Sequence, residues 1–148
     1  MSAEPEAGAV PAAEPSLPHM VRLVQVIAEL REHCLWTADL THEALSRYLI
    51  EEAQETVEEI EAGPVGDPVR EDRFRTELGD VLLQVVLHAQ LAAERGAFDL
   101  DAVAEAITAK LIRRNPHVYA EDGTLDPQPA TREEIEAAWA RIKQQEKS

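Results

Sequence analysis

The sequence has little of what a disulfide-bonded or membrane-spanning protein requires. Its 148 residues include one cysteine, Cys34, so no disulfide can form within the chain and a reducing compartment is the simpler expectation. No run approaches the ~20 apolar residues of a transmembrane helix. The start of the chain also lacks the basic residues and apolar centre of a signal peptide. We therefore expect a cytoplasmic protein with no membrane partner.

Basic and aromatic residues are also scarce. Lys and Arg number 14 against 29 Asp and Glu, which gives a formal net charge of -15. A surface this acidic repels the phosphate backbone, so extended nucleic acid is excluded as a partner. A small anion remains a candidate ligand where metal cations and local basic residues reverse the field. Aromatic residues are only 4%, so Ala, Leu, Val and Ile must form the core.

Apolar residues recur at intervals of three and four along most of the chain, a spacing typical of amphipathic helices, and no alternating strand pattern is present. The sequence therefore predicts an all-α fold. Residues 1–18 are rich in Ala, Pro and Glu and predict a disordered tail, and residues 19–148 predict a single domain. The helices are expected over residues 20–34, 42–62, 72–94, 99–115 and from 131 onward, with Thr41, Asp99 and the pair Thr131 and Glu134 at their starts.

The helix expected over residues 72–94 is apolar around much of its circumference. One small subunit can hardly cover such a helix on several sides, so a partner subunit is expected to cover it. Gly79 lies inside this helix, where it destabilises by about 1 kcal/mol relative to Ala. We therefore expect another helix or a ligand to approach closely at Gly79.

Four carboxylates lie on or beside the apolar stripes of two successive helices. Glu52 and Glu55 are three residues apart, as are Glu77 and Asp80, and residues at this spacing are neighbours on a helix surface. An antiparallel helix pair would bring both pairs face to face, where their repulsion calls for a cation. All-oxygen ligation favours magnesium or manganese, and a site that keeps waters and binds phosphates suits magnesium best.

The acidic residues have two other interpretations. Glutamates at these spacings also occur on solvated helix faces, which is the favoured interpretation for Glu51 and for Glu58, Glu59 and Glu61. A di-iron helical bundle would instead require Glu-x-x-His pairs. The third residue after Glu52 is Glu55, so the di-iron interpretation is disfavoured.

Basic residues gather in one place in this acidic chain. Lys110 and Arg114 are four residues apart and share a helix face, with Arg113 beside them. Trp139 and Lys143 repeat the spacing on the last helix and offer an aromatic surface and an ammonium group for phosphate. Core packing for Trp139 and solvation for Lys143 remain alternatives.

Taken together, these motifs resemble those of the MazG-type nucleoside triphosphate pyrophosphohydrolases, a family of the all-α NTP pyrophosphatase superfamily. The resemblance extends from Leu23 to Lys143. It is carried by Tyr48-Leu49-Ile50-Glu51-Glu52-Ala53-Gln54-Glu55, Glu77-Leu78-Gly79-Asp80-Val81-Leu82-Leu83-Gln84-Val85-Val86, Lys110-Leu111-Ile112-Arg113-Arg114, Pro116-His117-Val118, Trp139 and Lys143.

The resemblance implies a specific activity and site. The reaction would be Mg2+-dependent hydrolysis of nucleoside triphosphates to the monophosphate and pyrophosphate, with Mn2+ as a substitute, in nucleotide-pool house-cleaning. The helical bundle would have a four-helix core completed by homodimerisation, or by a higher oligomer. The implied metal ligands are Glu52, Glu55, Glu77 and Asp80, the implied water-orienting catalytic residue is Glu51 or Glu55, and the implied substrate-binding residues are Lys110, Arg114, Trp139, Lys143 and Trp36.

The chain departs from the family pattern at two points. Where the family usually has Cys-Pro-Trp-Asp, this chain has Cys34-Leu35-Trp36-Thr37, and where the family usually has His before Pro-His-Val, it has Asn115. These changes concern base preference and rate more than the metal chemistry. They leave a second hypothesis, a catalytically weak helical dimerisation or nucleotide-sensing module.

Overall fold

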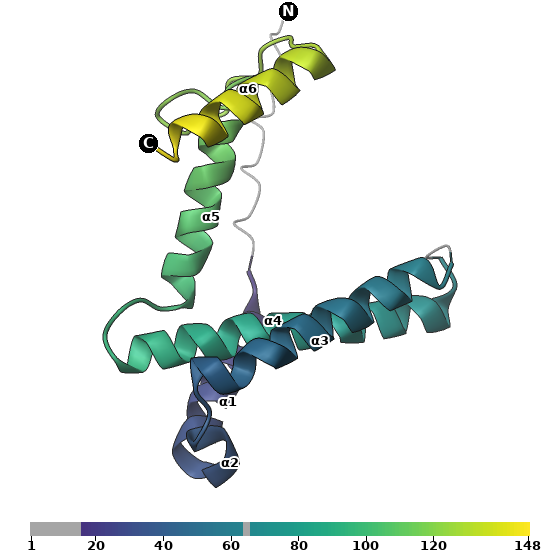
Figure 1. The fold of residues 1–148 in the computed structure, drawn as a ribbon, viewed down its shortest axis with the longest axis vertical. Helices are drawn as coiled ribbons and strands as arrows, with labels where there is room; N and C mark the ends of the chain where they lie inside the picture. The colour runs from purple at the N-terminus through teal and green to yellow at the C-terminus, as the bar shows by residue number, and fades with distance from the viewer. Residues whose placement is uncertain (1–15, 64–65) are drawn as a thin grey trace, which may run out of the picture. The chain divides into compact units, whose positions relative to one another are not determined.

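The computed structural model describes residues 16–63 and 66–148, and these residues are almost entirely helical or irregular. The helices are α1 (Pro18–His33), α2 (Leu35–Ala38), α3 (His42–Glu61), α4 (Pro68–Glu94), α5 (Leu100–Arg114) and α6 (Arg132–Gln145) (Figure 1). Within residues 16–63 and 66–148 no β-strand is assigned, and Tyr119 and Leu125 form an isolated antiparallel β-bridge. The prediction of an all-α fold is confirmed.

The chain divides into two compact units, one ending at Ala38 and the other beginning at Asp39. The first unit holds α1 and α2. The sequence predicted no helix between residues 34 and 42, and α2 was missed because a single helical turn is too short to show periodicity. Nη1 of Arg31 donates hydrogen bonds to the carbonyl oxygens of Thr37 at 2.6 Å and Ala38 at 2.8 Å, so a contact from α1 holds this turn. Most of the predicted tail, residues 1–15, lies outside the described residues.

In the second unit, α3 and α4 lie side by side as an antiparallel pair (Figure 1). Thr41 caps α3 as predicted, since its side chain accepts a hydrogen bond from the Ala44 amide at 3.1 Å. Gly63 follows the end of α3 with a φ of 134°, a conformation that side chains rarely adopt. The predicted start of α4 at residue 72 was wrong. The helix begins at Pro68, because proline fits the first turn, where its missing N–H is not needed.

Arg70 connects the end of α3 to the start of α4. Its Nη1 donates to the carbonyl oxygen of Ala62 at 2.9 Å, and its Nη2 donates to that of Glu59 at 2.8 Å. The last carbonyls of a helix have no partner within the helix. Arg70, from the first turns of α4, therefore satisfies the last turn of α3 and fixes the return of the chain.

The apolar stripe of the hairpin is only partly covered within one chain. Leu45, Val86 and Leu87 are buried. Other stripe residues on α3 and α4 keep between 37% and 49% of their surface exposed, namely Leu49, Val57, Ile60, Leu78 and Val85. A Cβ added at Gly79 would meet no described atom within 4 Å beyond its own stretch of helix, so the described residues do not make the close approach of another helix expected there.

Helices α5 and α6 begin with the caps that the sequence predicts. The Asp99 side chain accepts a hydrogen bond from the Ala102 amide at 2.9 Å. Thr131 and Glu134 form the reciprocal capping box, with bonds of 3.1 Å and 3.2 Å. None of the helices in the described part of the chain is both long and apolar enough to span a bilayer.

Candidate functional site

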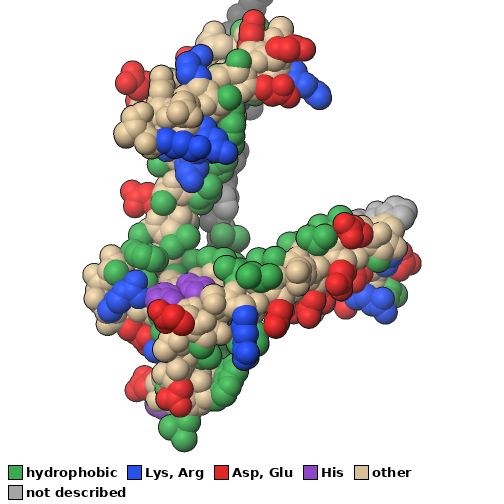
Figure 2. Space-filling view, viewed as in Figure 1, with side chains coloured by type: hydrophobic (Ala, Val, Ile, Leu, Met, Phe, Trp, Pro, Cys, Tyr) green, Lys and Arg blue, Asp and Glu red, His purple; other side chains and the backbone are tan. Residues whose placement is uncertain are grey.

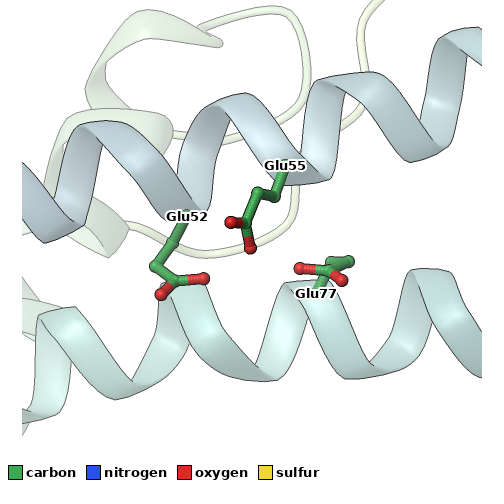
Figure 3. Close-up of side chains that lie close together, drawn as sticks. All are labelled: Glu52, Glu55 and Glu77. Atoms are coloured by element: carbon green, nitrogen blue, oxygen red, sulfur yellow. The ribbon is translucent and has the colours of Figure 1, made fainter.

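Three of the four predicted carboxylates converge between the two helices of the hairpin. Glu52 and Glu55 point from α3 toward α4, and Glu77 points from α4 toward α3 (Figure 3). One carboxylate oxygen from each of these three residues lies within 4.8 Å of the other two. No other group of three or more His, Cys, Asp or Glu side chains comes this close together among the described residues. Glu52 and Glu77 are half-buried, whereas Glu55 is exposed. The sequence spacing on each helix and the antiparallel return of the chain together account for this convergence.

Asp80 lies outside this tight group but close enough to act on it electrostatically. Its charge is one of those that raise the pKa values of Glu52 and Glu77. Glu51 is exposed on α3 and does not join the group. The structure therefore brings together three of the residues expected at the site, with Asp80 in the surrounding field.

Burial and mutual repulsion make these carboxylates costly to keep ionised. Loss of hydration raises the pKa of Glu52, and the charges of Glu55, Asp80 and Glu77 raise it further. The pKa of Glu77 is raised by the same loss of hydration and by Glu55, Asp80 and other acids of α3. Both shifts mark a place where several negative charges lie close together and away from water.

The unpaired oxygen of Glu77 tests whether a metal fits this place. Glu77 Oε2 is buried and has no hydrogen-bond partner among the described residues. A buried carboxylate oxygen without a partner is strongly unfavourable unless something else satisfies it. The ligand atoms available are all carboxylate oxygens, the donors that hard divalent cations prefer. The residues present therefore suit a divalent cation, and the cluster could bind one.

Thr56 links the two sides of the cluster, and sequence analysis missed this role. Its side chain is buried in the hairpin and lies within hydrogen-bond reach of two carbonyl oxygens, that of Glu52 at 2.9 Å and that of Glu77 at 3.3 Å. The hydroxyl therefore contacts the backbone of one carboxylate residue on each helix. The sequence marks Thr56 only as a polar residue in an apolar stripe, a signal that does not reveal its partner.

A basic cluster lies where α5 meets α6, and Figure 2 shows Lys and Arg side chains gathered over this region. The guanidinium of Arg114 lies over the ring of Trp139 at 5.1 Å from its centroid. Arg113 and Arg114 both bond to the carboxylate of Glu146. The structure thus joins two of the predicted substrate-binding residues, Arg114 and Trp139, and adds Glu146, which no sequence motif had indicated.

The other predicted substrate-binding residues are more exposed. Lys110 on α5 and Lys143 on α6 are both solvent-exposed. Trp36 lies on α2 in the first unit and keeps 69% of its surface exposed.

An all-α protein with a carboxylate cluster in a helix hairpin is the class that the fold and the site define. A family model described as the MazG nucleotide pyrophosphohydrolase domain matches residues 40–119. The chain belongs to the MazG family. The matched residues include the whole of α3, α4 and α5, and with them the carboxylate cluster.

Individual relatives agree with this assignment. The chain is 48% identical over 101 residues to a protein of Thermotoga maritima named nucleoside triphosphate pyrophosphohydrolase/pyrophosphatase MazG, an alignment that covers 67% of this chain and 37% of that protein. It is 35% identical over 130 residues to the nucleoside triphosphate pyrophosphohydrolase of Escherichia coli, with coverage of 86% and 45%. The chain thus spans less than half the length of these two relatives.

A solved structure supports the fold independently. The crystal structure of a mazG-related protein from Thermotoga maritima matches with a TM-score of 0.65 and 22% sequence identity. The match covers 84% of this chain and 98% of that one. At this identity the likeness concerns the fold alone.

Proposed function

We propose that this protein hydrolyses nucleoside triphosphates or deoxynucleoside triphosphates to the monophosphate and pyrophosphate, in a reaction that depends on Mg2+. The observation that carries the proposal is the convergence of Glu52, Glu55 and Glu77 in the hairpin of a MazG-family chain. Two similar proteins are named for this activity. The cellular role would be house-cleaning of canonical or damaged nucleotides in the cytoplasm.

In this proposal Glu52, Glu55, Glu77 and Asp80 hold the metal. Bound Mg2+ would supply a Lewis acid for the α-phosphate and a water of lowered pKa. Glu55 is exposed at the edge of the cluster and Glu51 lies on the outer side of α3, so either carboxylate is a candidate to accept a proton from the attacking water. Asp80, outside the tight group, would complete the set when the substrate arrives with its metal.

The basic cluster of α5 and α6 would bind the nucleotide. A triphosphate brings negative charge beyond what the metal neutralises, and Lys110, Arg114 and Lys143 would supply the remaining cations. Trp139 offers a flat surface for stacking, and Arg114 already lies over its ring. Trp36 is a further candidate for stacking, since its ring is largely exposed.

The exposed apolar residues of the hairpin support a homodimer. Ile50 and Val57 on α3 keep 61% and 48% of their surface exposed, and Leu78 on α4 keeps 47%. Contiguous exposed apolar residues on a small domain typically mark an interface. Two hairpins packed through these faces would form the four-helix core, and light scattering should report twice the chain mass or a higher multiple of it.

The direct test incubates the protein with a panel of NTPs and dNTPs plus Mg2+ and identifies the products. Monophosphate and pyrophosphate are expected. Release of orthophosphate and nucleoside diphosphate, or turnover that does not depend on the metal, would contradict the proposal. Nucleotide binding without turnover would favour the second hypothesis, a nucleotide-sensing module. The departures at Leu35 and Thr37 make that outcome worth measuring.

A further inference from the structure

Glu146 lies just beyond the end of α6 and engages two arginines of α5. Its Oε1 accepts a hydrogen bond from Nε of Arg113 at 2.7 Å. Its Oε2 accepts from Nη2 of Arg114 at 2.6 Å and from Nε of the same residue at 3.3 Å. One carboxylate therefore links two adjacent guanidinium groups and joins the end of α5 to the end of α6.

Arg114 is fixed from two directions. The edge formed by Nε and Nη2 faces Glu146, and Cζ of the guanidinium lies over the ring of Trp139, 5.1 Å from its centroid. The Arg114 side chain is only 13% exposed and that of Glu146 only 21%. The hydrogen bonds of Arg114 to Glu146 use Nε and Nη2, so Nη1, at the other end of the guanidinium, is left for a ligand.

We propose that Glu146 is a positioning residue, which holds Arg113 and Arg114 in the geometry that binds the phosphates of the nucleotide. The inference rests on the function proposed above. Arginine has a long flexible side chain, and a ligand must order it before a bidentate contact can form. Glu146 orders both guanidinium groups before the nucleotide arrives.

The charges in this cluster remain favourable for an anion. Two guanidinium groups and one carboxylate leave a net charge of +1. Hydrogen bonds from Arg114, followed by those from Arg113, lower the pKa of Glu146 to about 2, so its charge is constant over any practical assay range. The alternative role for Glu146 is an internal competitor that occupies the arginines until phosphate displaces it. That role predicts the opposite sign of effect on affinity.

The experiment compares Glu146→Gln, Glu146→Asp and Glu146→Ala in the full-length protein, with Glu136→Gln as the control. Glu136 is an exposed acid on α6, and Glu136→Gln changes the net charge by the same amount as Glu146→Gln. Positioning predicts that Glu146→Ala raises KM about tenfold and leaves kcat within about twofold, because the arginines bind ground state and transition state alike. Glu146→Asp should recover part of the loss, and the control should behave like the parent protein.

Binding of inorganic tripolyphosphate, measured by calorimetry, gives a second readout that does not require turnover. The dissociation constant should rise about tenfold in Glu146→Ala and much less in the control. A lower KM or tighter tripolyphosphate binding in Glu146→Gln would show competition and overturn the inference, as would variants that match Glu136→Gln. If the parent protein releases no pyrophosphate from any nucleotide, the proposed function fails, and the tripolyphosphate measurement still decides the role of Glu146. Circular dichroism melts confirm that each variant is folded.

Discussion

Replacement of Glu77 by Gln should have opposite effects on stability without and with metal. Glu77 has one buried oxygen without a partner among the described residues, and its pKa is raised by burial and then by nearby acids. Because an amide carries no charge, Glu77→Gln relieves this repulsion at nearly constant size. We therefore expect the metal-free variant to melt at a higher temperature than the metal-free parent protein.

Added Mg2+ should reverse this order. A ligand present at 100 times its dissociation constant stabilises the folded state by about 2.7 kcal/mol. For a protein of this size, 1 kcal/mol shifts Tm by ~2–4 °C, so saturating Mg2+ should raise the Tm of the parent protein by about 5–10 °C. The variant loses one of the three convergent carboxylates and should gain only a small part of this shift.

The assay is a thermal melt followed by circular dichroism, with a chelator and then with increasing Mg2+. Glu51→Gln is the matched control, since Glu51 is exposed on α3 and lies outside the convergent group. It should lose the same formal charge and keep the full Mg2+ shift. A full Mg2+ shift in Glu77→Gln, or no shift in the parent protein, would refute the carboxylate site.

Further predictions concern the hairpin that carries the site. Thr56→Val should lower the free energy of unfolding by about 1 kcal/mol and Tm by a few degrees, because it removes a buried hydroxyl that contacts both helices. Thr56→Ser keeps a hydroxyl and should retain most of the parent protein's stability. Arg70→Met should destabilise the hairpin by a similar amount, measured by urea unfolding, since the last carbonyls of α3 lose their donors. Burial, with a smaller effect of the His42 charge, lowers the pKa of His88, so the folded state binds fewer protons than the unfolded state below the ordinary value of 6.5. The stability of the folded state should therefore fall as pH drops below 6.5. The Tm of His88→Asn should depend less on pH in this window than the Tm of the parent protein. An equal pH dependence in the two proteins would argue against the effect.

The helices were predictable from sequence because their signals are local. Thr41, Asp99 and Thr131 each place a capping oxygen within three residues of the amide they bond, so the sequence contains both partners. The early start of α4 at Pro68 was missed because residues 63–68 are rich in glycine and proline, a composition typical of a loop. The same proline is equally suited to the first turn of a helix.

The carboxylate cluster was predictable in outline for a similar reason. Spacing on each helix fixes which acids share a face, and a hairpin of this length brings the faces together. The distances between helices are not in the sequence, which is why Asp80 could not be separated from the tighter group of three. The partners of Thr56 and Glu146 lie 21 and 32 residues away and become visible only once the helices pack.

The central claim is tested most directly by hydrolysis in oxygen-18 water, with and without Mg2+, followed by mass spectrometry of the products. Water attack on the α-phosphate predicts that the label enters the nucleoside monophosphate, that pyrophosphate stays unlabelled, and that turnover stops when the metal is chelated. Label in pyrophosphate, labelled orthophosphate with a nucleoside diphosphate, or undiminished turnover in a chelator would contradict the account.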